Sequence, residues 1–188
     1  MNSVRVVCHQ LAPRIGDAEY NRTLSAEAIR SAAALGAQVV VLPALTPSGY
    51  VLTDTQEALR VSEPLDGPTL TLWKTLANSL NIIVVAGFCE RLTATQVANS
   101  AALIEPHGRL TVYRKAHLWD RETLIFTPGT EPPPVVDTAV GRIAGMICYD
   151  LELPEWVRLA ALAGADLLCA PVNWPDGPRP AGERPAEI

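Results

Sequence analysis

Apolar and polar positions follow two different periods along the chain, and this predicts both helices and strands. Between residues 17 and 35 apolar side chains recur at helical spacing, and Gly36 is a natural end for that helix. The run Val39–Leu42 is apolar throughout and ends at Pro43, which is typical of a strand covered on both faces. A second long helix opens after Gly67-Pro68. Its apolar face is predicted to comprise Leu72, Trp73, Leu76 and Leu80.

Two pairs of short apolar runs flank turn sequences and predict β-hairpins. One pair, 99–104 and 110–113, brackets Pro106-His107-Gly108, and the other, 135–138 and 142–148, brackets Ala139-Val140-Gly141. The remaining predicted elements are strands at 4–10, 82–86 and 167–170 and a helix from Pro154 to about Ala163. Strands that alternate with helices, with hairpins between them, indicate a mixed α/β fold with a largely buried sheet.

One stretch of sequence occurs twice at a constant offset. Residues 36–43 and residues 164–171 each contain a Gly-Ala pair, a polar residue, an apolar run and a proline. Such a match arises by chance at helix-to-strand junctions, but the residue classes agree over the whole window. The repeat therefore favours a pseudo-two-fold sandwich with equivalent strands at its centre.

Composition narrows the class of protein. The chain has 188 residues, of which 48% are hydrophobic and 19% charged, so we expect one domain over residues 1–188 with a sizeable core. The net charge of -5 argues against a nucleic-acid partner and against a polybasic membrane anchor. The proline-rich segment after Asn173 has no apolar period, and residues 176–188 are predicted to form a loop-like tail.

The sequence also predicts the location of the chain and the redox state of its cysteines. No apolar run approaches the roughly 20 residues of a membrane-spanning helix, and the N-terminal residues read at once as a strand, which together predict a cytoplasmic protein. Four cysteines are present without a C-x-x-C pair, so free thiols are expected, and their spacing from the histidines does not suit a metal site. We therefore expect neither metal nor cofactor.

Three residues stand out as candidates for chemistry. Cys148 follows an apolar strand and precedes the turn into the helix at Pro154, where backbone N–H groups can stabilise a thiolate or an oxyanion. Lys115 is one of only two lysines and lies in an unusually apolar stretch, and Glu122 follows seven residues later, where it can pair with the lysine. The alternatives are an inert buried thiol, an exposed cation at a turn and a solvated surface carboxylate.

These segments together resemble the carbon–nitrogen hydrolase (nitrilase) superfamily, in its amidase and carbamoylase branch. The matching stretches are 39–43 with Gly49-Tyr50, Tyr113–Leu118, Glu122 with Phe126–Gly129, Gly145–Glu155 and Ala170–Pro175. The resemblance implies a four-layer αββα sandwich that associates into homodimers or higher homo-oligomers. Because domains of this family are usually longer, it also implies that the chain is truncated at its C-terminus.

The resemblance assigns roles to individual residues and reveals one departure. Lys115 and Cys148 match two members of a Glu-Lys-Cys triad, and Glu122 matches a second glutamate that supports the lysine. Ala44 occupies the position of the triad glutamate, which acts as general acid and base. The chain is then either a deliberately inactivated variant or a natural non-catalytic relative. Glu152 or Glu155 is a less favoured substitute base.

The resemblance also implies a function. Cys148 would attack the carbonyl of a small amide, with Lys115 and the Tyr149 N–H holding the oxyanion, and water would hydrolyse the thioester. An N-carbamoyl amine is the alternative substrate, and a nitrile is less expected because tyrosine follows the cysteine. A ligand-binding or scaffold relative and a thiol redox protein are the alternatives from other classes. The residues predicted to line the substrate pocket are Tyr50, Trp119, Tyr149, Asn173 and Trp174.

Overall fold

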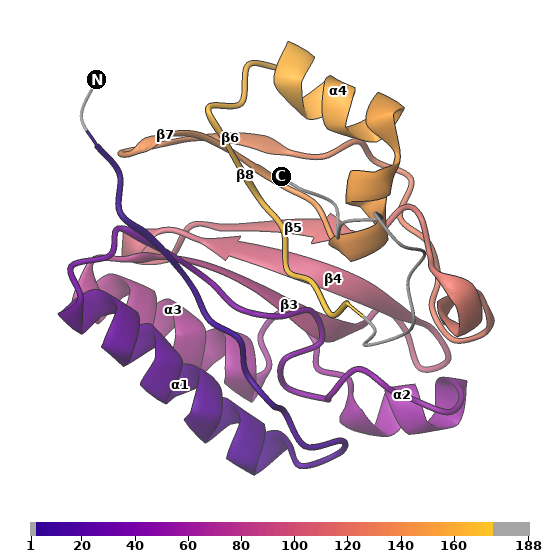
Figure 1. Cartoon of the computed structure of the whole chain (residues 1–188). Coiled ribbons are helices and arrows are strands. Elements are labelled where there is room, and N and C mark those ends of the chain that lie inside the picture. The colour runs from indigo at the N-terminus through magenta and orange to yellow at the C-terminus, as the bar shows by residue number, and fades with distance from the viewer. Residues whose placement is uncertain (1–2, 175–188) are drawn as a thin grey trace, which may run out of the picture.

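The computed structural model describes residues 3–174 and arranges them in four layers, helix–sheet–sheet–helix (Figure 1). No helix in this part of the chain has the length and apolar character needed to cross a membrane. The strands are β1 (Val6–Cys8), β2 (Val39–Val41), β3 (Ile83–Arg91), β4 (Val97–Ile104), β5 (Leu110–Arg114), β6 (Val135–Thr138), β7 (Gly141–Gly145) and β8 (Leu167–Cys169). The helices are α1 (Ala18–Ala34), α2 (Thr55–Val61), α3 (Pro68–Leu80) and α4 (Pro154–Leu162), with 3-10 turns η1 (Pro106–Gly108), η2 (Asp120–Leu124) and η3 (Cys148–Glu152).

The first sheet has the strand order β1-β2-β3-β4-β5 and is covered on one face by α1 and α3 (Figure 1). The first three strands are parallel, as the two predicted crossover helices require, and the last three are antiparallel. Of these, β4 and β5 form the predicted hairpin. Successive residues of β2 point to opposite faces, so Val40 packs under the helices while Val39 and Val41 face the second sheet. Both faces of β2 are therefore buried, which explains why its sequence is continuously apolar.

The second sheet has the order β6-β7-β8 within the described residues, and α4 covers its outer face (Figure 1). Its inner face contributes Ile143 and Cys169 to the cluster shared with Val41 of the first sheet. Its outer face packs Ala144 and Leu168 with Ala160 of α4. Hydrophobic burial on both faces of both sheets thus holds the predicted αββα sandwich together.

The repeated sequence is repeated in the structure as well. Ala37 and Ala165 each donate a backbone hydrogen bond to the carbonyl five residues earlier, at the end of α1 and of α4, after a glycine with positive φ. The next residues, Gln38 and Asp166, each donate to the carbonyl of an arginine at the start of the parallel partner strand: Arg5 just before β1, and Arg142 within β7. The two β-strand–helix–β-strand units are thus locally equivalent. β8, however, lies at the edge of its sheet in the described part and not at its centre.

Several predicted boundaries need correction. The first strand covers three residues instead of 4–10, the strand predicted at 82–86 runs on to Arg91, and the strand predicted at 142–148 ends at Gly145. On α3 the buried face includes Leu70 and Ala77 in place of Leu72 and Leu80, which are only partly buried.

Helix α2 was not predicted, because its seven residues are too few to show a helical period. It has a recognisable start, however. Asp54 caps it by accepting the Glu57 N–H at 2.8 Å, and the Glu57 carboxylate in turn accepts the Thr53 N–H.

Candidate active site

The site lies where the ends of β2, β7 and β8 meet. The chain leaves β2 through Pro43 to Ala44, whose N–H donates to the Val172 carbonyl at 3.4 Å, just beyond β8. Cys148 follows β7, and its N–H donates to the Pro171 carbonyl at 3.2 Å. Ligands of open α/β sheets bind at such carboxyl ends, so the fold brings two of the predicted residues to a suitable edge.

Cys148 does not end a strand, as predicted, but opens the 3-10 turn η3. Its φ of 45° lies in the left-handed region, which residues with a side chain seldom adopt. The turn is stabilised by Asp150, whose Oδ2 accepts the Ile147 N–H at 3.2 Å. A cysteine kept in this conformation by its surroundings fits a functional position better than a packing position.

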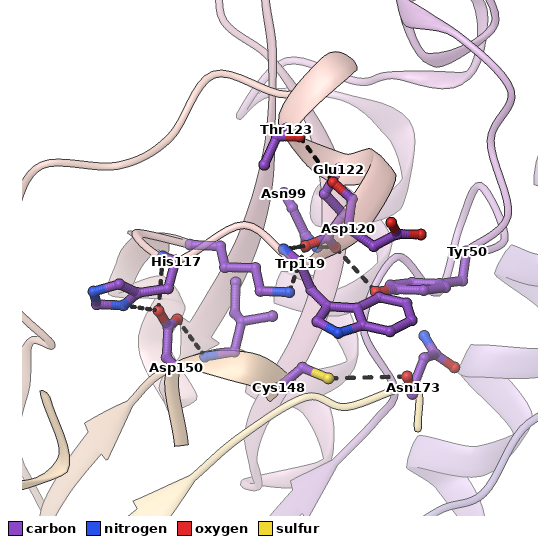
Figure 2. Close-up of polar contacts among 12 residues, drawn as sticks. Tyr50, Asn99, His117, Trp119, Asp120, Glu122, Thr123, Cys148, Asp150 and Asn173 are labelled. Carbon is purple, nitrogen blue, oxygen red and sulfur yellow. Dashed lines mark hydrogen bonds and ion pairs between the residues drawn. The ribbon is translucent and has the colours of Figure 1, made fainter. Parts of the chain in front are cut away.

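The Cys148 thiol is 4% exposed and lies in a partly polar setting. Burial raises the pKa of this thiol above its usual value, while backbone hydrogen bonding at Asn173, the charge of Lys115 and the Tyr149 N–H act in the opposite direction. Sγ lies 3.9 Å from the Asn173 carbonyl oxygen, to which the neutral thiol donates (Figure 2). The sulfur is therefore neither in pure hydrocarbon nor remote from charge.

Lys115 and Glu122 form a buried ion pair. Lys115 is completely buried, Glu122 is 6% exposed, and the lysine Nζ lies 2.6 Å from Oε2 of the glutamate. Lys115 is therefore not an exposed cation at a turn, and Glu122 is not a solvated surface carboxylate. Burying two charges is unfavourable unless the remaining hydrogen-bonding positions are also filled.

The Glu122 carboxylate has those additional partners. Its Oε1 accepts hydrogen bonds from Asn99 Nδ2 at 2.8 Å and from the Tyr50 hydroxyl at 3.1 Å, and its Oε2 accepts the Trp119 N–H at 2.8 Å (Figure 2). Together with Lys115 these make four donors for two oxygens. These donors fix the Glu122 carboxylate in place, and the carboxylate in turn fixes the lysine.

Tyr50 remains a neutral phenol in this setting. Burial, and then the negative charge of Glu122, raise its pKa well above the usual value for tyrosine. The Tyr50 hydroxyl is therefore a permanent hydrogen-bond donor to Glu122.

Ala44 is 1% exposed and lies against the backbone of β3. A Cβ added to Gly87 would come within 2.5 Å of the Ala44 Cα, so only glycine at position 87 permits this approach. Asn173 Nδ2 donates to the Ala44 carbonyl at 2.6 Å, which connects Ala44 with the residue beside the Cys148 sulfur. Glu152 and Glu155, the less favoured substitute bases, are both exposed.

The remaining predicted pocket residues surround these groups. Trp174 and Tyr50 pack against the cluster that contains Ala44 and Cys148. The Trp119 indole is 38% exposed, and Figure 2 shows it together with Tyr50 and Asn173 in the region of the Cys148 sulfur. Tyr149, which follows the cysteine, is partly buried. The structure thus brings all nine predicted site residues into one region.

A second buried carboxylate, Asp150, was not predicted as a site residue. It is completely buried and accepts hydrogen bonds from Tyr113, His117 and Ile147. Asn99 was also not predicted. In the sequence, both residues can be recognised as polar residues within an apolar stretch. A buried polar group needs hydrogen-bond partners, and such partners are commonly part of a site.

The other cysteines have different surroundings. Cys89 and Cys169 are buried, and burial raises the pKa of each thiol to about 12, whereas Cys8 is exposed. All four cysteines are free thiols. Residues 3–174 contain no cluster of three or more histidine, cysteine or acidic side chains able to hold a metal ion.

The chain belongs to the carbon–nitrogen hydrolase family, whose pattern it matches over residues 5–186. It is 34% identical to a nitrilase of Pyrococcus abyssi over 171 residues, which cover 90% of this chain and 65% of the relative. It is 36% identical to an (R)-stereoselective amidase of a Pseudomonas species, covering 85% of this chain and 56% of the relative. The chain thus spans less than two thirds of the length of these curated relatives.

Solved structures show the same fold. An amidase from a Nesterenkonia species superposes with a TM-score of 0.81 at 31% identity, covering 90% of this chain and 64% of the amidase. A variant of that amidase with one glutamate replaced by leucine carries the acetamide moiety of fluoroacetamide, covalently added at the active-site cysteine. The four-layer sandwich predicted from the sequence is therefore confirmed.

Proposed function

We propose that this chain is the catalytic part of an amidase that cleaves a small amide at its non-peptide C–N bond through a thioester on Cys148. We further propose that Ala44 leaves it severely impaired in turnover. The observation that carries the proposal is the buried Lys115–Glu122 pair, in which Glu122 holds Lys115 in place and the lysine charge favours the Cys148 thiolate. A completely buried lysine is rare, and stabilisation of a thiolate and then of an oxyanion is a physical reason for one beside a cysteine.

Each residue has a distinct part in this mechanism. The Cys148 thiolate attacks the amide carbonyl carbon, and the carbonyl oxygen becomes an oxyanion held by Lys115 Nζ and the Tyr149 N–H. Glu122 does not touch the substrate but keeps Nζ in place. The tetrahedral intermediate then collapses to a thioester and releases ammonia or an amine. Water hydrolyses the thioester to a carboxylate and the free thiol.

Three proton transfers accompany these steps. The Cys148 thiol must lose its proton, which solvent can take, the leaving nitrogen must be protonated, and the attacking water must be deprotonated. The methyl group of Ala44 can carry none of these protons. General acid–base catalysis typically contributes about 10² to 10⁴-fold, so we expect amide turnover to fall by at least that range. Attack by the thiolate on a good alkylating agent needs no such carrier and should persist.

The relatives support the expectation that the cysteine can still be alkylated when the glutamate is absent. In the Nesterenkonia amidase the glutamate and the cysteine that were exchanged in a double mutant are separated by the same number of positions as Ala44 and Cys148. In that enzyme the glutamate-to-leucine variant still bears a covalent adduct at the active-site cysteine. A cysteine without the glutamate can thus be modified covalently in a protein of this fold.

The test is to install the missing carboxylate. Ala44→Glu should increase hydrolysis of small amides by about 10² to 10⁴-fold over the parent chain, measured as ammonia released. The matched control is Ala44→Gln, which has the same size and no proton to transfer, and it should gain nothing. Equal activity of the two variants, or rapid turnover by the parent chain, would show that position 44 is not that of the general base.

A panel of small amides, N-carbamoyl amines and nitriles, each tested on Ala44→Glu, separates the alternative substrates and functions. Small aliphatic and aryl amides are expected to be better substrates than N-carbamoyl amines or nitriles. Preferential cleavage of N-carbamoyl amines by Ala44→Glu would support the runner-up reaction. Ligand binding without turnover by Ala44→Glu would favour a binding or scaffold relative.

Two further proposals concern the setting of the protein. We propose a cytoplasmic location, which the four free thiols support because disulfides are rare in a reducing compartment. We also propose association into homodimers or higher homo-oligomers. Leu159 and Leu162 on α4 support this proposal, since they are 42% and 71% exposed.

A further inference from the structure

We propose that Asp150 is a positioning residue that holds the Lys115 segment and the Cys148 turn in register with one another. This inference rests on the roles proposed above for Lys115 and Cys148. Asp150 is completely buried, and its two carboxylate oxygens accept four hydrogen bonds from both segments.

The first set of contacts reaches the lysine segment on both sides of Lys115. Two residues after the lysine, the His117 N–H and ring Nδ1 contact Asp150 Oδ1 at 3.0 and 2.8 Å. Two residues before it, the Tyr113 hydroxyl donates to Oδ2 at 2.8 Å. Because a carboxylate oxygen only accepts, the proton of the His117 ring lies on Nδ1. The segment around Lys115 is therefore held at two points by one side chain, through the Tyr113 hydroxyl and through His117. Figure 2 shows the contact between His117 and Asp150.

The second set of contacts reaches the cysteine turn. Oδ2 also accepts the N–H of Ile147, the residue immediately before Cys148, at 3.2 Å. This bond closes the turn in which Cys148 has its left-handed conformation. Asp150 thereby connects the backbone that carries the proposed nucleophile with the backbone that carries the proposed oxyanion ligand.

The surroundings make this connection rigid. Trp156 of α4 donates from Nε1 to the Tyr113 hydroxyl at 2.8 Å, and its ring lies edge-on to His117 with centroids 4.7 Å apart. Burial, and then the negative charge of Asp150, raise the pKa of Tyr113, so its hydroxyl stays a donor. Since the hydrogen-bonding groups around Asp150 are all donors, an uncharged amide at position 150 would leave at least one of them without an acceptor.

Asp150 acts through the other residues, because its oxygens are occupied by these donors and none contacts the Cys148 sulfur. Its loss should let the lysine and cysteine segments shift relative to each other. The charge of Lys115, which favours the Cys148 thiolate, would then act less strongly on the sulfur. The reactivity of the thiol reports this change without any need for amide turnover.

The experiment measures the rate at which iodoacetamide alkylates each cysteine of the full chain, resolved by mass spectrometry of peptides. At pH 8, Asp150→Asn should slow the labelling of Cys148 by about three- to tenfold, as expected for a thiol pKa raised by up to one unit. Exposed Cys8 serves as the internal reference for reagent concentration. Buried Cys89 and Cys169 stay unlabelled as long as the variant is folded.

A double-mutant cycle separates positioning from general loosening. Lys115→Met alone should slow the labelling of Cys148 by about tenfold, and adding Asp150→Asn should then change the rate by less than about twofold. If Asp150→Asn slows Cys148 labelling in the Lys115→Met background by the same factor as it does alone, Asp150 acts independently of the lysine. That result would overturn the proposal. An unchanged Cys148 rate in Asp150→Asn would overturn it as well.

Two further variants secure the interpretation. Glu63→Gln is the matched control, because Glu63 also accepts two close hydrogen bonds, from the Thr69 N–H and hydroxyl, at 2.8 and 2.7 Å, but in another part of the fold. It should leave the Cys148 rate unchanged. If labelling of Cys89 shows that Asp150→Asn is unfolded, Tyr113→Phe replaces it in the same cycle, with a smaller loss expected.

The cycle also distinguishes this inference from the proposed function. Should Lys115→Met leave the Cys148 rate unaltered in a folded protein, the proposed role of the lysine fails and the positioning role fails with it. Should Lys115→Met slow the reaction while folded Asp150→Asn does not, only the positioning role fails.

Discussion

The two sides of the site differ in what they provide. On one side Lys115 and Glu122 are buried, paired at 2.6 Å and surrounded by hydrogen-bond donors to the carboxylate. On the other side Ala44 offers a methyl group and a backbone that is bonded to Asn173 and Val172. The electrostatic part of the proposed mechanism is complete, and the proton-transfer part has no group to perform it. Separate elements of the fold provide these two parts, so we expect that one can be lost while the other remains.

Removing the proposed nucleophile should have the largest effect on the two activities, cysteine labelling and amide hydrolysis. Cys148→Ala should abolish labelling by iodoacetamide at this position and should also abolish any amide hydrolysis gained by Ala44→Glu, because both need the same sulfur. Ammonia release by the Ala44→Glu variant measures the second effect. Hydrolysis that survives Cys148→Ala would assign the reaction to a different nucleophile.

Breaking the ion pair should have the next largest effect. Glu122→Gln leaves the buried Lys115 ammonium without a counter-charge, and loss of one partner of a buried pair typically costs about 3 to 5 kcal/mol of stability. Urea unfolding measures the change. Glu131→Gln, at an exposed position, is the control and should change stability by less than about 0.5 kcal/mol. A similar small change for Glu122→Gln would contradict the paired state of the two residues.

The pH dependence of Cys148 alkylation tests the role of Lys115. Because the Cys148 thiol has a raised pKa, its alkylation rate should increase about tenfold per pH unit between pH 7 and 9 and should continue to rise above the usual thiol pKa. Lys115→Met should move this profile to still higher pH, since the lysine charge favours the thiolate. A rate that is already constant at pH 8 would contradict the raised pKa.

The smallest expected effect concerns the hydroxyl of Tyr50. Tyr50→Phe removes one of the four donors to Glu122 and should lower the free energy of unfolding by about 1.5 to 3 kcal/mol, as is usual for a hydrogen bond to a charged group. Tyr20→Phe is the matched control, because Tyr20 is 36% exposed. Equal stability of the two variants would mean that Asn99 and Trp119 suffice to stabilise the carboxylate.

Much of the fold could be predicted from local sequence. The helix over 17–35, the hairpin around Pro106-His107-Gly108 and the helix from Pro154 are seen as α1, β4–β5 and α4. Their periods and turn residues are local signals that tertiary contacts did not override. Helix α2 and the end of β7 were missed because a short helix and a strand that continues into a turn leave no distinct period.

The amino-acid sequence alone shows which residue types are available for chemistry, including a cysteine after an apolar strand, a rare lysine and an alanine at the end of another strand. That Lys115 is completely buried against Glu122, and that Asn99, Tyr50 and Asp150 surround these residues, follows from the packing of the folded chain. The physical reason is that hydrogen bonds between segments far apart in the chain leave no periodic pattern in the sequence. Such bonds exist only once the two sheets have packed together and brought their strand ends to one edge.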